Sequence, residues 1–328
     1  MAQMSKKIQF HDNEKLKKVN SETLKLWKRY ESDMSLRNLS EGTIKGYKND
    51  IEHLWIYTYD NFANVPITDL TEDDLTEFFY YCKTEGNNTK RIKRRMSCIS
   101  AFYKYLRKKK IITENPMEFI DRPAKDVDVI TQTFLSKEQI ADLKQKLEEN
   151  YNNAGTTGQK HLALSYWCYA LFSLSTMARV TAVSNIKWNQ IDFDERVVTD
   201  VLEKEAKVVT LYFSEEVKKV LGKLKAFREE NNIDDGGWVF VSNDRGEYRK
   251  ASSNTLSQWC KKIGTIISVP SLHPHDFRHS SSTLLRNSGM ALEDIAVLLN
   301  HESTETTLKY YIRRDDTKVV AKKDELGI

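Results

Sequence analysis

A short segment near the middle of the chain divides it, because this segment lacks the helical pattern found on both sides. Residues 121–133 have no helical spacing of apolar side chains, contain Pro123 and begin with charged residues, as a connector between folded units does. Just before it, Asn115-Pro116 closes a helical region, since proline keeps the preceding residue out of helical geometry. The 328 residues are enough for two cores. We expect a charged N-terminal extension (1–21), a first domain (22–120), the connector (121–133), a second domain (134–315) and a C-terminal tail (316–328).

The first domain is predicted to be helical. Ser40 is expected to cap a helix that buries Ile44 and Tyr47, and Thr71 with Asp74 forms a capping-box pair that opens another helix. From residue 90 to residue 110, apolar side chains recur every three to four positions, which predicts an amphipathic helix. The outer face of that helix is basic and carries Lys90, Arg91, Lys93, Arg94, Arg95, Lys104, Arg107, Lys108, Lys109 and Lys110.

Cations on a helix face usually form only a solvated surface, and the net charge of +4 is too small to imply a partner by itself. The helix that begins at Ser40, however, also leaves Lys45 and Lys48 outside. Neighbouring basic surfaces favour contact with nucleic acid, because lysine and arginine displace the counterions that surround DNA phosphates. We therefore predict a surface that binds double-stranded DNA through Lys45, Lys90, Arg91, Arg94 and Arg95.

The second domain is predicted to be mostly helical with a small sheet. Ser136 and Gln139 form a capping-box pair that opens it. Two β-rich runs, residues 197–202 and 208–213, flank a tip that carries lysines, which predicts a hairpin. A third run at residues 238–241 could be a strand or an extended loop.

Several features indicate a cytoplasmic protein without a membrane partner. The apolar stretch from Leu162 to Met177 is shorter than the roughly 20 residues that a bilayer span needs, so it is predicted to be a buried helix. No apolar signal-peptide region follows Lys6 and Lys7. The cysteines lie far apart without a Cys-x-x-Cys pair, which is typical of small core side chains in a reducing compartment.

The C-terminal part of the second domain holds side chains suited to attack on a phosphodiester. The run His275-Asp276-Phe277-Arg278-His279 precedes Asn300-His301, and Tyr310 follows nine residues after His301. A tyrosine hydroxyl, whose ordinary pKa is about 10, is a poor nucleophile unless cationic and imidazole groups surround it. All of these groups are present close together in the sequence.

With these motifs, the chain from about residue 22 resembles the tyrosine recombinase (phage integrase) family. The N-terminal half matches diffusely, in Ser40 to Thr43 before Tyr47, in the Lys90 to Tyr105 helix and in Asn115-Pro116. The second domain matches specifically, with the Thr-x-x-Arg turn Thr176 to Arg179, a hairpin lysine, His-x-x-Arg-His, and Leu-x-His followed by Tyr. The resemblance implies a mainly α fold, in which a helical core-binding domain is paired with a mixed α/β catalytic domain that contains a small antiparallel sheet.

Carried over residue by residue, the resemblance implies a catalytic set of Arg179, Lys204, His275, Arg278, His301 and Tyr310. Arg179 and Arg278 would hold the scissile phosphate, because guanidinium groups present paired donors to its non-bridging oxygens. His275 would assist in deprotonating Tyr310. The reaction would give a 3′-phosphotyrosyl link without metal, ATP or any other cofactor.

The other two groups of the implied set act on the phosphate and on the leaving group. His301 would donate a hydrogen bond to the phosphate, and Lys204 would protonate the departing 5′-oxygen. Lys207 lies on the same hairpin and is an alternative to Lys204, as Tyr311 is to Tyr310. His279 is interpreted as a structural residue that braces Arg278.

Two other interpretations of these residues are a zinc site and a site that has lost its activity. His273, His275 and His279 could suggest a metal site, but Pro274 constrains the first pair and no cysteine is near, so no metal is expected. The chain also departs from the family pattern, with Met177-Ala178 in place of Gly-Leu, Ala182 in place of glutamate and Asn300 in place of glycine. Asparagine tolerates positive φ better than most residues, so Asn300 is the mildest change.

The resemblance therefore implies a site-specific DNA recombinase that acts as a tetramer on DNA. Integration and excision of a mobile element is the expected role, with transposon movement and chromosome-dimer resolution as the alternative roles. Two rival functions remain open. One is a DNA-binding relative with weakened strand transfer, and the other is an enzyme similar to a type IB topoisomerase. The tail at residues 316–328 is expected to contact a neighbouring protomer.

Overall fold

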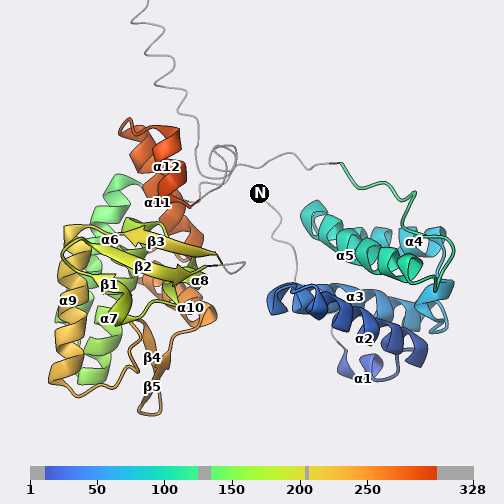
Figure 1. Cartoon of the computed structure of the whole chain (residues 1–328), viewed down its shortest axis with the longest axis horizontal. Helices are drawn as coiled ribbons and strands as arrows, with labels where there is room; N and C mark the ends of the chain where they lie inside the picture. The colour runs from blue at the N-terminus through green and yellow to red at the C-terminus, as the bar shows by residue number, and fades with distance from the viewer. Residues whose placement is uncertain (1–11, 125–133, 204–206, 301–328) are drawn as a thin grey trace, which may run out of the picture. The chain divides into compact units, whose positions relative to one another are not determined.

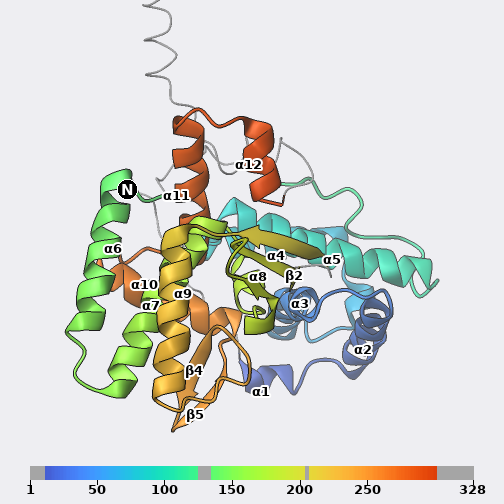
Figure 2. The same cartoon turned by 60° about the vertical axis from the view of Figure 1, so that its left-hand side comes forward.

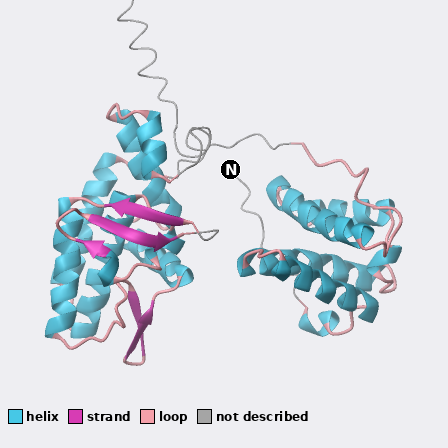
Figure 3. Cartoon of the chain, viewed as in Figure 1, coloured by secondary structure: helices cyan, strands magenta, loops and turns pink. Residues whose placement is uncertain are grey.

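The computed structural model describes residues 12–124, 134–203 and 207–300. The chain divides into two compact units, residues 1–130 and 131–328, and each has its own hydrophobic core. In the described part of the chain, the first unit contains only helices, and the strands all lie in the second (Figures 1 and 3). The mainly α fold with small antiparallel sheets is thus confirmed.

The first unit is a helical bundle whose helices begin where local sequence signals predict. The Ser40 hydroxyl accepts a hydrogen bond from the Thr43 amide, and Thr71 and Asp74 form the predicted capping box. Its elements are α1 (Asn13–Leu16), α2 (Ser21–Leu36), α3 (Glu41–Asn61), the 3-10 turn η1 (Ile67–Asp69), α4 (Glu72–Thr84) and α5 (Thr89–Lys108).

Aromatic side chains join α2, α3 and α5 in the core of this unit. The Trp27 ring lies edge-on to Trp55 and Phe102, with ring centroids 5.6 and 5.4 Å away. Such edge-to-face pairs add to the stabilisation from apolar burial. Because Ile92, Ile99 and Phe102 face this core, the opposite face of α5 is turned outward. The predicted amphipathic helix is therefore present.

The second unit is organised around one buried helix, α7. Its elements are α6 (Lys137–Asn152), α7 (Thr157–Thr176), α8 (Val180–Val183), the 3-10 turn η2 (Trp188–Gln190), β1 (Ile191–Asp192), β2 (Val197–Leu202), β3 (Val208–Tyr212), α9 (Glu215–Glu230), β4 (Val241–Asp244), β5 (Glu247–Lys250), α10 (Ser253–Ile266), α11 (Pro274–Asn287) and α12 (Leu292–Leu298). Helix α7 contacts α6, α9, α10, α11 and β3. No helix among the described residues has both the length and the apolar character of a membrane span.

The predicted hairpin is present as β2 and β3, which with β1 form an antiparallel sheet of order β1-β2-β3. Val198, Val201, Val209 and Leu211 are buried, so one face of the sheet packs on the core. Leu202 pairs with Val208 next to the tip of the hairpin. The tip itself, residues 204–206, lies outside the described residues.

The third β-rich run is mostly a loop. Only Val241 of residues 238–241 is in a strand, and Trp238 makes a single bridge with Lys187. The strand β4 pairs with β5 in a second hairpin, which turns at Gly246 with φ 96°. Both views place this hairpin at one end of the second unit and α11 and α12 at the other (Figures 1 and 2). All four cysteines are buried and free, which confirms their predicted place in the cores.

Candidate active site

The turn between α7 and α8 brings Arg179 to the surface of the second unit. Helix α7 ends at Thr176, and its C-cap residue Met177 has a left-handed backbone with φ 52°. The Thr176 hydroxyl donates to the carbonyl of Phe172 and accepts a hydrogen bond from the Ala178 amide. The helix therefore stops just before Arg179, whose side chain is 29% exposed at the start of α8.

Arg179 is held by a carboxylate of the hairpin. Its Nη1 atom donates a hydrogen bond to Oε2 of Glu203, whose side chain is only 1% exposed. The Glu203 amide also donates to the carbonyl of Lys207 at 2.8 Å, which closes the described part of the hairpin. Lys204 follows Glu203 directly, but it lies outside the described residues.

Lys207, the alternative hairpin lysine, lies beside the last described residue. Its Nζ atom donates to the carbonyl oxygen of Asn300 at 3.3 Å. Asn300 has φ 52°, which is the left-handed backbone that asparagine was expected to tolerate. The choice between Lys204 and Lys207 as the general acid therefore stays open.

Helix α11 carries the His-x-x-Arg-His motif. Its start is fixed by Asp276, which accepts a hydrogen bond from the His273 amide at 2.9 Å and lies 3.0 Å from Nδ1 of the His273 ring. His275 lies at the surface, with its ring partly shielded from solvent. Partial burial, followed by the charges of His273, Arg278 and Arg179, lowers the pKa of His275. The neutral imidazole is thus favoured, and a neutral imidazole can accept a proton.

Arg278, the second guanidinium of the predicted clamp, is 1% exposed. Its Nη1 atom donates to the carbonyl oxygen of Met177 and its Nη2 atom to that of Leu299. It therefore joins the end of α7 to the end of α12.

His279, interpreted from the sequence as a structural residue, is partly buried one position further along α11. Burial, with the charges of His275, His273 and Arg278, lowers its pKa to about 4. Arg179, His275 and Arg278 are thus brought together, and His279 lies beside them. His301, Tyr310 and the rival Tyr311 lie outside the described residues. Within the described ranges, no group of three or more acidic, histidine or cysteine side chains could hold a metal ion.

The predicted DNA-binding residues of the first unit are exposed with one exception. Lys45, Lys90, Arg91 and Arg94 face solvent, whereas Arg95 is 1% exposed. The Arg95 Nη1 atom donates to Sγ of Cys82 at 3.0 Å, and its Nε atom lies 3.7 Å from Oδ1 of the buried Asp50. The prediction that Arg95 contacts DNA is therefore wrong, because position 95 lies on the same face of α5 as Ile92 and Ile99.

The second unit also carries a cationic cluster that its sequence did not predict. The Nζ atoms of Lys187 and Lys250 lie 4.8 and 4.4 Å from the centre of the Trp238 ring. Burial, followed by the charge of Lys187, lowers the pKa of Lys250. Two ammonium groups near one indole are a suitable site for a phosphate. These residues are far apart in the sequence, and only Gly236-Gly237 before Trp238 marks a special turn there.

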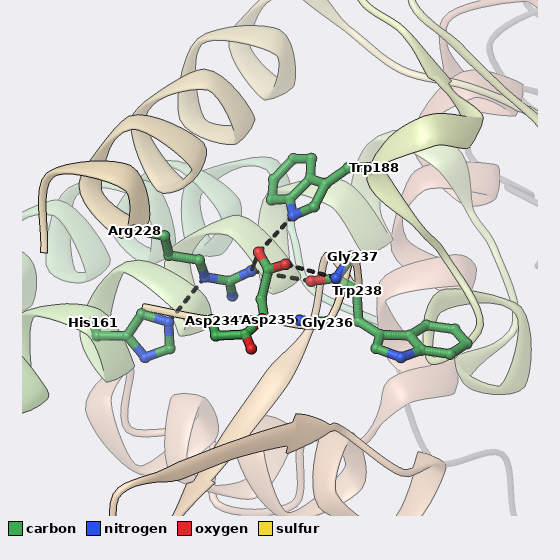
Figure 4. Close-up of polar contacts among 8 residues, drawn as sticks. All are labelled: His161, Trp188, Arg228, Asp234, Asp235, Gly236, Gly237 and Trp238. Carbon is green, nitrogen blue, oxygen red and sulfur yellow. Dashed lines mark hydrogen bonds and ion pairs between the residues drawn. The ribbon is translucent and has the colours of Figure 1, made fainter. Parts of the chain in front are cut away.

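A buried polar network fixes the loop that presents Trp238 (Figure 4). Asp235 accepts hydrogen bonds from Nε1 of Trp188 at 2.7 Å and from Nη1 of Arg228 at 2.9 Å. The Arg228 Nε atom donates to Nε2 of His161 at 3.0 Å. Burial, then the charge of Arg228, lowers the pKa of His161 to about 4, so the ring acts as a neutral acceptor. We interpret the network as support for the Lys187–Trp238–Lys250 cluster.

Two family models match the chain. The model of the phage integrase family matches residues 133–318, which is more than half of the chain. The model of the phage integrase N-terminal SAM-like domain matches residues 28–110.

Curated proteins and solved structures show the same similarity. Tyrosine recombinase XerC of Pediococcus pentosaceus is 25% identical over 287 residues, which cover 84% of this chain and 88% of that protein. XerC of Herpetosiphon aurantiacus is 27% identical over 285 residues, 84% of this chain and 85% of that protein. The Tn1549 transposon integrase bound to transposon right end DNA has a TM-score of 0.66 at 18% identity, over 92% of this chain and 99% of that chain. A lambda integrase dimer bound to a COC′ core site has a TM-score of 0.63 at 17% identity, over 86% of this chain and 96% of that chain.

Proposed function

The chain belongs to the phage integrase family and is a site-specific tyrosine recombinase, and from this premise we propose that it cuts and rejoins double-stranded DNA through Tyr310. The observation that carries the proposal is the grouping of Arg179, His275 and Arg278. Segments far apart in the sequence supply these side chains. Arg278 donates to the carbonyl oxygen of Met177, two residues before Arg179, and His275 precedes Arg278 by three positions on α11. Such a grouping of guanidinium and imidazole groups is suited to a phosphate that becomes five-coordinate.

In the proposed reaction, the Tyr310 oxygen attacks the scissile phosphorus and the bond from phosphorus to the 5′-oxygen breaks. His275 accepts the proton of the tyrosine, which its lowered pKa permits. Arg179 and Arg278 stabilise the negative charge on the non-bridging oxygens, and His301 donates a further hydrogen bond.

The leaving group needs a proton of its own, because an alkoxide leaves poorly. Lys204 supplies this proton to the 5′-oxygen, with Lys207 as the alternative. The products are a 3′-phosphotyrosyl link and a free 5′-hydroxyl. A different 5′-hydroxyl then attacks the link and releases the tyrosine, so that strands are exchanged without a metal ion or ATP.

Two basic surfaces would bind the DNA backbone. One is formed by Lys45, Lys90, Arg91 and Arg94 of the first unit, and the other by Lys187 and Lys250 of the second. We also propose integration and excision of a mobile element as the biological role, and a tetramer as the active assembly. The similarity to the Tn1549 transposon integrase and to a lambda integrase tetramer bound to a Holliday junction supports both. The tail at residues 316–328 would contact a neighbouring protomer.

A nicked suicide substrate tests the proposal. This duplex carries a nick near the cleavage site, so that the short 5′-hydroxyl fragment diffuses away and the covalent adduct persists. We expect an adduct with the unsubstituted protein and with Tyr311→Phe, but none with Tyr310→Phe, although all three bind the DNA. Binding without any adduct would instead indicate a DNA-binding relative. Relaxation of plasmids that lack a special sequence, without recombinants, would indicate an enzyme similar to a type IB topoisomerase.

A further inference from the structure

We propose that Glu203 is a positioning residue for Arg179, so that the β2–β3 hairpin sets the orientation of the first arginine of the clamp. This inference rests on the proposed function, because it assigns a task to Arg179. Glu203 contacts neither the tyrosine nor the phosphate in this proposal. It acts through the guanidinium that it holds.

The first observation is the burial of the Glu203 carboxylate. Its side chain is 1% exposed, and Oε2 accepts a hydrogen bond from Nη1 of Arg179. Oε1 is buried and has no hydrogen-bond partner among the described residues. A buried carboxylate is costly unless it is paired with a cation, so Arg179 is the group that makes this burial tolerable. Removing Arg179 would leave this buried carboxylate without its cation.

The second observation is the position of the Arg179 side chain. It is 29% exposed although one of its Nη atoms is bound to a buried carboxylate. A guanidinium is planar and has five N–H donors in fixed directions, so fixing one edge also fixes the direction of the others. The remaining donors can then meet a phosphate without a search over many rotamers.

The third observation is that the hairpin is joined to the α7–α8 region at more than one point. The Asn185 side chain, just after α8, donates to the carbonyl of Leu202 at 3.0 Å. Leu202 directly precedes Glu203, so the end of β2 and the segment that carries Arg179 are connected as one unit. Helix α8 itself consists of Val180, Thr181, Ala182 and Val183 and offers no carboxylate. The hairpin supplies one instead, in the residue directly before Lys204.

This arrangement makes a specific prediction for cleavage. Glu203→Ala removes the carboxylate that orients Arg179 but keeps the arginine itself in the chain. Misplacing a catalytic group by about 1 Å can slow a reaction on the order of 100-fold, so we expect the cleavage rate constant at saturating nicked DNA to fall by roughly 10- to 100-fold. DNA affinity should stay close to that of the unsubstituted protein. Glu203→Gln keeps the shape and a hydrogen-bond acceptor, and should recover part of the rate.

A double-mutant cycle separates positioning from a general structural role. The single variants Glu203→Ala and Arg179→Lys are compared with the double variant in the rate of adduct formation. If Glu203 acts through Arg179, Glu203→Ala should slow the Arg179→Lys protein far less than it slows the unsubstituted protein. Glu195→Ala, on the turn between β1 and β2, is the matched control with an exposed carboxylate and should leave the rate unchanged.

Two results would overturn the inference while leaving the proposed function intact. One is an unchanged rate in both Glu203 variants. The other is the same fold-reduction by Glu203→Ala in both backgrounds, which would indicate a structural effect independent of Arg179. If Glu203→Ala does not fold, the near-isosteric Glu203→Gln takes its place in the same cycle. An unsubstituted protein that binds DNA but forms no adduct would overturn the proposed function and this inference together.

Discussion

The guanidinium of Arg278 donates a hydrogen bond to the carbonyl oxygen of Met177, which lies 101 residues earlier in the chain. Met177 has the left-handed φ of 52°, and its side chain packs with Ile295 and Leu299. The same guanidinium donates to the carbonyl oxygen of Leu299. One buried side chain thus connects the turn that carries Arg179 to the segment that leads to His301. Arg278 is therefore a structural brace as well as a proposed phosphate ligand.

Replacing Arg278 should reduce stability as well as cleavage. In Arg278→Lys, a single ammonium cannot match the fork that reaches two carbonyl oxygens. A hydrogen bond to a charged group contributes about 1.5–3 kcal/mol, so we expect the free energy of unfolding to fall by about 2 kcal/mol or more. Denaturant unfolding of the purified protein measures this change. Unchanged stability together with lost cleavage would mean that the buried bridge contributes little.

Substitutions of Arg91 and Arg95 are predicted to have opposite effects on stability and on DNA binding, although both residues lie on α5. Arg95→Met should destabilise the first unit by about 1–3 kcal/mol, because the buried Asp50 then loses its contact with Arg95 and keeps the one with the exposed Arg94. Arg91→Ala should change stability by less than about 0.5 kcal/mol, because its side chain is exposed. DNA binding by Arg91→Ala should weaken, with a salt dependence shallower by about one unit. Titrations at several salt concentrations and unfolding curves for both variants test this contrast. A stable Arg95→Met protein with weakened DNA binding would reverse our assignment.

The His161–Arg228 contact should make the second unit sensitive to acid. The ordinary pKa of 6.5 is lowered to about 4 in the folded chain, so the unfolded chain binds the proton first as the pH falls. The stabilisation is complete above pH 6.5 and is lost as the pH falls towards 4. A shift of this size corresponds to at most about 3 kcal/mol.

The variant His161→Gln tests this dependence. It keeps an acceptor for Arg228 but cannot titrate, so its stability should fall less steeply between pH 6.5 and pH 4. The pKa of His279 is also lowered to about 4, so His279 also makes the fold less stable as the pH falls. Part of the pH dependence of stability should therefore remain in His161→Gln. Denaturant unfolding at several pH values provides the comparison. Identical slopes for the two proteins would show that His161 is not the group responsible.

The Lys187–Trp238–Lys250 cluster is predicted to bind a DNA phosphate. The double variant Lys187→Ala with Lys250→Ala should weaken DNA binding and make its salt dependence shallower by up to about two units. Lys219→Ala, an exposed lysine of α9, is the control and should have a smaller effect. Equal effects of the double variant and the control would argue against a specific phosphate site.

The features predicted correctly from the sequence are mostly those set by local interactions. The helix starts at Ser40, Thr71 and Ser136 depend on side chains within three residues of one another, so their pattern is visible in the sequence. The hairpin of β2 and β3 also depends on neighbouring residues. In β3, buried and exposed positions alternate, and this alternation is a short-range signal.

The features that were missed depend on partners far along the chain. Position 95 shares the apolar face of α5 with Ile92 and Ile99. The sequence does not show, however, that Cys82 and Asp50 lie where they can pair with a buried cation. The pairing of Arg179 with Glu203 likewise requires the hairpin to fold back onto α8. The hairpin of β4 and β5 has short and largely exposed strands, so it lacks the apolar alternation by which strands are recognised.

The covalent bond to Tyr310 is the central claim, and it can be identified directly. The adduct formed on nicked DNA is digested with nuclease and protease, and the peptide that retains a nucleotide is fragmented by mass spectrometry to separate Tyr310 from Tyr311. We predict a nucleotide joined through its 3′-phosphate to the Tyr310 oxygen. A nucleotide on another residue, or one joined through its 5′-phosphate, would contradict the mechanism.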